Sequence, residues 1–150
     1  MANKVTATPY LTVKGGKEAI AFYKKAFGAK QSMLMMAEDK QRVMHASLTI
    51  AGAGVMLSDS FAEFSPPGSP KAPPDLGGSS TAVHLDVPDA DKVWNKAVKA
   101  GATIVIPIED QFWGQRFGML GDPFGHNWSI GGPLKKKPVA KKKAAKKKKL

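Results

Sequence analysis

The feature that most constrains this chain is an internal repeat, in which one order of elements occurs twice. The matching positions are Val13 and Val87, Gly28 and Gly101, and Gly54 and Gly125, at offsets of 74, 73 and 71 residues. Each half has the pattern of one strand, one helix and three further strands. A lone βαβββ unit covers only one face of its sheet with its helix. Two such units side by side are therefore expected to curve their sheets around a shared cleft.

The first half predicts four strands and one amphipathic helix. The strands are expected over residues 6–13, 30–37, 43–50 and 55–59, and the helix over residues 17–27. Ile20, Tyr23 and Phe27 recur at three and four residues, which gives the helix one apolar stripe. Gly28 suits the left-handed residue that commonly ends a helix.

The second half repeats this order. Strands are expected over residues 82–87, 103–108, 117–121 and 127–130, and a helix over residues 90–100. Asp89 is placed to cap that helix, and Gly101 to end it. The apolar stripe of the helix consists of Val93, Trp94, Ala97 and Val98.

The stretch from Phe112 to Ile130 predicts a hairpin around the turn formed by residues 121–125. It contains two Trp, an Arg, a His and an Asp-Pro pair within nineteen residues. Pro and Gly fix the backbone of the turn. A hairpin that is only structural rarely needs so many polar and aromatic groups. We therefore expect this stretch to form one wall of a pocket.

A proline-rich segment separates the halves, and a basic segment follows the second. Residues 61–78 contain five prolines and are expected to form an extended linker. One domain is expected over residues 5–132, with module one at 6–60 and module two at 79–132. Residues 133–150 are expected to be a disordered tail of Lys, Ala and Pro. Ten tail lysines carry ten of the eleven net positive charges, so residues 1–134 are nearly neutral, at +1.

The composition excludes several classes of protein. The chain has no Cys, so it forms neither a disulfide nor a thiolate metal site. No apolar run is long enough to cross a bilayer, and the first four residues lack the apolar stretch of a secretory signal. A cytoplasmic location is therefore expected.

Three motifs point to a known family. They are the opening TPYLTVKGGKEAIAFYKKAFGA, the segment MHASLTIAGAGVMLSD, and WGQRFGMLGDPFGHNWSI near the end of the second half. With the duplicated βαβββ unit, they resemble the vicinal oxygen chelate superfamily, which includes glyoxalase I, bleomycin-resistance proteins and extradiol dioxygenases. The last two motifs are most similar to its PhnB-like branch. The resemblance covers residues 6–130. It implies an α+β fold of two curved mixed sheets around a cleft, often completed by a second chain, so a homodimer is expected.

Enzymes of this superfamily usually hold a divalent metal with four side chains, one near the start of each half and one on the final strand of each half. Matching the strands places those positions at Thr8, Met56, Ala82 and Ser129. None of them is His or Glu. The side chains of Met and Ala cannot coordinate a hard divalent ion, and Thr and Ser hydroxyls are poor ligands by themselves. The resemblance therefore implies a family member without the usual metal site, and no cofactor is expected.

Strand alternation places a polar set on the same faces as those four positions. Its members are Tyr10, Thr12, His45, Ser47, Ser58, His84, Asp86 and Asn127. One hypothesis makes His45 and His84 part of a different metal site or an acid/base pair, with His45 bonded to Ser58 or Asp59. The other makes them hydrogen-bonded walls of a binding pocket, because a neutral imidazole both donates and accepts.

The aromatic hairpin supplies further candidates. Arg116 suits a carboxylate or phosphate held by two hydrogen bonds, or equally a stack on a neighbouring ring. By alternation Trp128 faces the helix, so Trp113 is the better ligand contact. Asp122 is expected to bond amides of the turn, and His126 to close it.

Three functions follow from these observations. The first is a metal-independent small-molecule binding protein, with Tyr10, His45, Ser58, His84, Trp113, Arg116 and Asn127 as the predicted ligand contacts. The second is a superfamily enzyme, of lyase or dioxygenase type, with a non-standard site at His45, His84 and Arg116. The third is a nucleic-acid-associated protein acting through its tail, which resembles the lysine-alanine tails of bacterial histone-like proteins. Its polyanion-binding residues would be Lys135, Lys136, Lys137, Lys141, Lys142, Lys143, Lys146, Lys147, Lys148 and Lys149.

Overall fold

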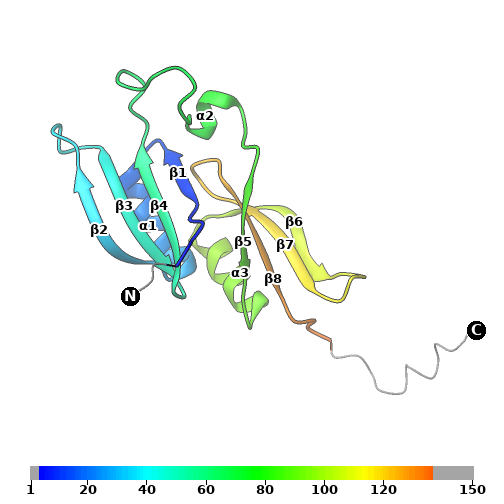
Figure 1. The fold of residues 1–150 in the computed structure, drawn as a ribbon. Coiled ribbons are helices and arrows are strands. Elements are labelled where there is room, and N and C mark those ends of the chain that lie inside the picture. The colour runs from blue at the N-terminus through cyan, green and yellow to red at the C-terminus, as the bar shows by residue number, and fades with distance from the viewer. Residues whose placement is uncertain (1–3, 137–150) are drawn as a thin grey trace, which may run out of the picture.

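The computed structural model describes residues 4–136, which contain two units of the predicted order (Figure 1). The first unit consists of β1 (Tyr10–Val13), α1 (Gly16–Phe27), β2 (Lys30–Met36), β3 (Val43–Ile50) and β4 (Ala53–Asp59). The second consists of β5 (Ala82–Asp86), α3 (Ala90–Ala100), β6 (Thr103–Asp110), β7 (Arg116–Gly121) and β8 (Asn127–Gly132). The predicted α+β fold of two βαβββ modules is confirmed.

Each unit forms its own four-stranded mixed sheet. The strand orders are β1-β4-β3-β2 and β5-β8-β7-β6, so the two sheets have the same topology. In each sheet the first strand pairs in parallel with the last strand of its unit, and the other neighbours are antiparallel. The parallel pairing places the first and last strands of a unit side by side. Positions far apart in the sequence therefore share one sheet face.

The first strand and the linker differ from the prediction. β1 begins at Tyr10 rather than at residue 6, because Pro9 has no N–H to donate and only its carbonyl pairs, accepting from the amide of Met56 at 2.9 Å. The linker is not extended throughout, since it contains the one-turn helix α2 (Pro73–Leu76). Pro at the first helical positions is compatible with that turn, because those N–H groups have no partner within a helix.

The helix ends follow the sequence prediction. Gly28 and Gly101 end α1 and α3 with φ angles of 68° and 123°, values that favour glycine. The side chain of Asp89 accepts a hydrogen bond from the amide of Lys92 and so caps α3. Among residues 4–136 no helix is long and apolar enough to cross a membrane.

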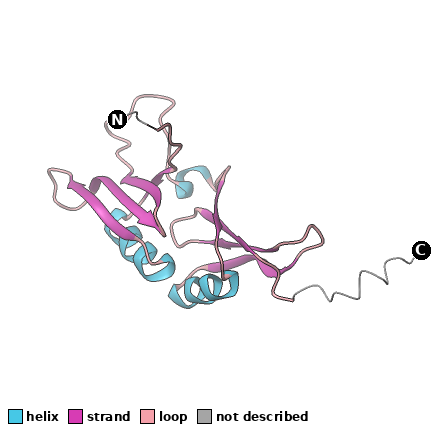
Figure 2. Cartoon of the chain, turned by 60° about the horizontal axis from the view of Figure 1, so that its bottom comes forward, coloured by secondary structure: helices cyan, strands magenta, loops and turns pink. Residues whose placement is uncertain are grey.

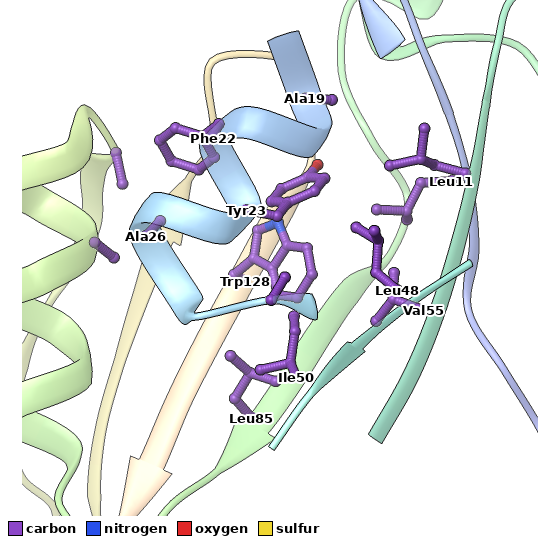
Figure 3. Packing of buried hydrophobic residues seen from close by; sticks show 14 of the residues in the cluster. Leu11, Ala19, Phe22, Tyr23, Ala26, Leu48, Ile50, Val55, Leu85 and Trp128 are labelled. Atoms are coloured by element: carbon purple, nitrogen blue, oxygen red, sulfur yellow. The ribbon is translucent and has the colours of Figure 1, made fainter. Parts of the chain in front are cut away.

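The core lies between the helices and one face of each sheet, with α1 and α3 side by side (Figure 2). Tyr23 and Trp128 are fully buried, and their ring centroids lie 5.2 Å apart (Figure 3). Phe27 packs on the same indole at 4.7 Å. The prediction that Trp128 faces the helix is confirmed. Because Tyr23 comes from module one and Trp128 from module two, these rings join the two modules.

The buried carboxylate of Asp122 completes this junction. One oxygen, Oδ2, accepts hydrogen bonds from the hydroxyl of Tyr23 at 2.5 Å and from Nε1 of Trp128 at 2.9 Å. The other, Oδ1, accepts from the amides of Phe124 and His126, as predicted for the turn. The His126 side chain reaches beyond the turn, where its Nε2 donates to the carbonyl of Thr12 at 2.9 Å. The turn of the second module is thereby bonded to the first module at two places.

The Tyr23 phenol should make the stability of this chain fall at alkaline pH. Burial, followed by the nearby Asp122 carboxylate, raises the pKa of Tyr23 well above 10.0. The folded state therefore keeps a proton that the unfolded chain loses near pH 10, and this contribution is present below that pH and lost above it. We expect the unfolding free energy of Tyr23→Phe to fall less than that of the wild type between pH 9 and 11, measured by urea titration. The exposed Tyr10→Phe is the matched control, and an equal fall in all three proteins would contradict the assignment.

Candidate functional site

Within residues 4–136, one face of each sheet has no helix packed on it. In the first sheet, one row across that open face contains Met33, Ser47, Met56 and Tyr10 in register. Met33 and Tyr10 are about half exposed, at 52% and 51%. The alternate residues Ala46, Leu48 and Leu57 are buried on the helix side. The strand alternation predicted from the sequence therefore holds, and the polar set lies on the open face.

Three polar side chains on this face form a hydrogen-bonded chain. The hydroxyl of Tyr10 lies 2.7 Å from Nδ1 of His45, and Nε2 of His45 lies 2.9 Å from Oγ of Ser47. The rings of Tyr10 and His45 also contact each other, with centroids 5.5 Å apart. The predicted bond from His45 to Ser58 or Asp59 is therefore not the one that forms. Both imidazole nitrogens already have a partner, so this chain fixes the orientation of the ring.

Asp59 has a structural role instead. It is buried, and its carboxylate accepts from the amides of Gly15 and Gly16 at 2.8 and 2.9 Å and from that of Val43 at 2.7 Å. It thereby caps the start of α1, where Gly15 offers no side-chain acceptor. Gly16 is required at this place, since a Cβ there would lie 2.6 Å from Oδ2 of Asp59.

His84 and Ser129 form the matching polar pair on the open face of the second sheet. Nδ1 of His84 lies 2.8 Å from Oγ of Ser129, its register partner on β8. The ring of Phe117 lies nearly parallel to the His84 ring, at 17°, with centroids 6.0 Å apart. Trp113 stands edge-on to Phe117 with centroids at 5.8 Å and is half exposed. This face therefore presents two aromatic side chains and one imidazole held by a serine.

Gly131 makes this arrangement possible. Gly131 lies on β8, where it pairs with Phe117 of β7, and it lies beside His84 on the open face. A Cβ at position 131 would lie 2.8 Å from Cε1 and 3.0 Å from Nε2 of His84. The imidazole thus occupies the space that a side chain at 131 would fill.

Arg116 is paired with carboxylates of its own module. Its Nε donates to Asp91 at 2.7 Å and its Nη1 to Asp110 at 3.2 Å, and its side chain is only 14% exposed. The Asp91 bond first, and the Asp110 bond after it, raise the pKa of Arg116, and the guanidinium in turn lowers the pKa of Asp91. Two N–H groups that would hold an anionic ligand are therefore occupied.

The four positions that strand matching assigned to the family's metal ligands lie in or beside the strands of the two sheets. Met56 and Ser129 are on the open faces, and Ser129 is bonded to His84. Thr8 lies beside Gly54, and Ala82 pairs with Asn127. Within residues 4–136, no group of three or more His, Cys, Asp or Glu side chains is arranged to hold a metal ion.

Two cavities lie beside the open faces. One of about 570 Å³ lies between the modules, where residues 6–9 and the start of β4 face His84 and its neighbours on β5. Another, of about 440 Å³, lies between the end of β5, including Asp86, and the turn at Gly114 and Gln115. A further cavity of about 860 Å³ lies under the proline-rich linker, away from the predicted ligand contacts.

Phe117 and Gly131 were not predicted from the sequence as part of this site. Gly131 follows Ser129 at the two-residue alternation of β8, and Phe117 is its pairing partner on β7, so strand alternation could have indicated both. Ser58 pairs with Thr12, and Asn127 pairs with Ala82 on one side and with Gly121 on the other.

Of the predicted polyanion-binding lysines, those from Lys137 onward lie outside the described residues.

Comparison with known proteins assigns the chain to a family. The model of the Glyoxalase/Bleomycin resistance protein/Dioxygenase superfamily matches residues 4–130, most of the chain, so the chain belongs to that superfamily. An uncharacterized protein of Mycobacterium bovis, Mb0911c, is 41% identical over 128 residues, which are 85% of this chain and 83% of that protein.

Solved structures show the same fold. The crystal structure of TioX from Micromonospora sp. ML1 has a TM-score of 0.65 at 25% identity and covers 87% of this chain and 100% of its own. The PhnB protein from Bacillus cereus has a TM-score of 0.63 at 20% identity and covers 85% of this chain and 99% of its own. The resemblance to the superfamily is confirmed, with a PhnB protein among the structures of this fold.

Proposed function

We propose that this member of the Glyoxalase/Bleomycin resistance protein/Dioxygenase superfamily binds a small molecule on the open faces of its sheets and needs no metal to do so. One observation carries the proposal. Each open face presents a histidine held by hydroxyl groups beside exposed aromatic or methionine side chains, where a structural sheet surface would present charges. Such a surface offers a few fixed polar groups within an apolar lining, as ligand sites do.

The metal-free part of the proposal rests on the donor set. Met56 and Ala82 cannot supply oxygen or nitrogen, and the hydroxyl of Ser129 is bonded to His84. The imidazole of His45 is fixed by Tyr10 and Ser47, with both ring nitrogens bonded. Binding by stacking and hydrogen bonding is the chemistry that these groups support.

We further propose that two copies of the chain associate, so that each open face is covered. The outer strands β2 and β6 expose apolar side chains in register with residues of the open faces. Their exposed fractions are 52% for Met33, 49% for Met35 and 42% for Ile106. Apolar patches of this kind mark interaction surfaces. A second copy would bury them and enclose the ligand between two sheets.

A ligand screen tests the binding proposal. We expect a subset of small aromatic compounds to raise the melting temperature of the wild-type chain in buffer with a chelator, because a ligand that binds only the folded state stabilises it. Phe117→Ala should lose that shift, because it removes a ring from the open face of the second sheet. Phe64→Ala is the matched control, as Phe64 is 77% exposed and lies in the linker. A screen without any hit, or hits unaffected by Phe117→Ala, would contradict the proposal.

A second function, binding to polyanions, is supported by the ten lysines near the end of the chain. The start of this segment is held on module two, since the amides of Lys135 and Lys136 donate to Asp110 and Nζ of Lys135 lies 3.2 Å from Asp91. We expect the full chain to bind double-stranded DNA with an affinity that falls steeply with salt, because released counterions drive such binding. Truncation after Lys136 should abolish the binding in a fluorescence anisotropy titration. Binding that persists in the truncated chain would place the polyanion site on the folded domain instead.

A further inference from the structure

We infer that the open face of the second sheet selects planar aromatic cations. This inference rests on the proposed binding function and names the class of ligand for one of its two faces. Three features of the second module carry it: an aromatic platform made possible by Gly131, two carboxylates in register with that platform, and a recess at its edge.

The platform consists of His84 and Phe117 with Trp113 beside them. The imidazole and the phenyl ring stack nearly parallel, at 17° with centroids 6.0 Å apart, and the imidazole occupies the space that glycine leaves open at position 131. Trp113 meets Phe117 at 66° and so presents an indole beside this pair. Parallel ring faces beside an indole fit a planar ring system, which stacks on a ring face and presents its edge to the indole.

Two carboxylates set the charge of the preferred ligand. Strand pairing aligns Asp86, Gly131, Phe117 and Glu109 in one row across β5, β8, β7 and β6. Directly paired residues point to the same face, so Asp86 and Glu109 lie at the two ends of the row that contains Phe117. Both are exposed. In the part of the chain that the structure describes, no ion pair engages either of them.

The guanidinium next to Phe117 in the sequence does not offset these charges. The guanidinium of Arg116 is paired with Asp91 and Asp110, two further carboxylates. Nζ of Lys135 also lies against Asp91. The aromatic rings present their negative π faces to the ligand, which adds to the preference for positive charge. Within residues 4–136, no Lys or Arg forms an ion pair with Asp86 or Glu109, so an anionic ring system would meet two carboxylates that carry their full charge.

A recess lies at the edge of the platform. Asp86, Val87 and Pro88 form one side of it and Gly114 and Gln115 the other, with a volume of about 440 Å³. Gly114 follows Trp113 directly, so the recess begins next to the indole. Because Asp86 belongs both to the row of Phe117 and to this recess, a cationic group of the ligand can reach the carboxylate while its rings stack on the platform.

A comparison of two planar dyes tests this inference with the full chain. Proflavine is a planar aromatic cation, and acridone is a neutral ring system of nearly the same size. A cationic probe also excludes the lysine segment as the cause of binding, because the lysines repel it. We expect wild-type protein to bind proflavine about tenfold more tightly than acridone in fluorescence titrations at low salt.

Matched variants separate the two parts of the inference. The double variant Asp86→Asn, Glu109→Gln should weaken proflavine binding and so bring the two affinities close together. Gly131→Ala should weaken both dyes, because the new Cβ displaces His84. Equal affinities for the two dyes in the wild type, or no binding of either, would overturn the inference. The wild type could also bind both dyes equally and lose that binding on Phe117→Ala. This result would support the proposed binding function and refute the selectivity for cations.

Discussion

Replacing Asp122 by Ala should destabilise this chain more than any other single truncation of a polar side chain. The change leaves the hydroxyl of Tyr23 and Nε1 of Trp128 without their acceptor in the core, and it removes the acceptor for the amides of Phe124 and His126. Removing one partner from a buried charged network costs about 3–5 kcal/mol, because the remaining donors stay desolvated. We expect the unfolding free energy, measured by urea titration, to fall by about that amount.

Two further variants show whether the effect belongs to the junction between modules. Tyr23→Phe removes one donor and keeps the ring, so it should cost about 1–2 kcal/mol. Asp89→Ala removes a carboxylate that also accepts a hydrogen bond from an amide, but at the exposed start of α3. It should lower the unfolding free energy by about 1 kcal/mol. A loss for Asp122→Ala no larger than for Asp89→Ala would show that the buried carboxylate does not hold the modules together.

Gly118→Ala should produce the second large loss, for steric reasons. Gly118 lies in β7, where a Cβ would be 2.7 Å from Cζ3 of Trp94 and 2.8 Å from the backbone Cα of Ile108. Ile108 precedes Glu109, which pairs with Phe117, so a shift of its backbone would disturb that pairing. Overpacking of this kind costs about 1–3 kcal/mol in ordinary cores, and we expect the upper end of that range here.

Gly78→Ala is the matched control for this substitution. Gly78 lies in the linker, its φ is not in the left-handed region, and a Cβ there would meet no atom within 4 Å. The unfolding free energy should therefore change by less than about 0.5 kcal/mol. Equal effects of the two substitutions would mean that helix α3 does not pack against β7 as closely as the structure has it.

The elements of this fold could be predicted from the sequence because their determinants are local. The apolar stripe of α1 and the glycines after both helices depend on residues a few positions apart, and they predicted the helix ends within one residue. The strand over residues 43–50 was predicted with its observed bounds for the same reason. The repeat then determined the topology, since a βαβββ unit can be completed in few ways.

The contacts between distant segments could not be predicted in this way. Asp122 was expected to bond only its own turn, whereas its bond to Tyr23 spans 99 residues. The partners of Arg116 lie 25 and 6 residues away, and nothing in the local pattern distinguishes those aspartates from other surface acids. The irregular register between β6 and β7 also has no local indication in the sequence. Such pairings follow from how the modules dock, which periodicity does not encode.

The sequence predicted which residues share the open faces, but not which hydrogen bonds these residues form. Alternation placed Tyr10, His45 and Ser47 together, and the structure shows that they form one hydrogen-bonded chain. The choice of partner depends on diagonal contacts across strands, where Tyr10 reaches His45 rather than its direct neighbour Met56. A correct face assignment therefore leaves several bonding patterns open.

The most direct test of metal-independent binding is elemental analysis of the protein in complex with a ligand found in the screen. Untagged chain is purified, saturated with that ligand, separated from excess ligand and analysed for Zn, Mn, Ni and Fe by mass spectrometry. We expect about one ligand per site, with each metal far below one ion per chain, and the same affinity before and after treatment with a chelator. Metal present in proportion to the ligand, with binding lost on chelation and restored by one of these ions, would contradict it.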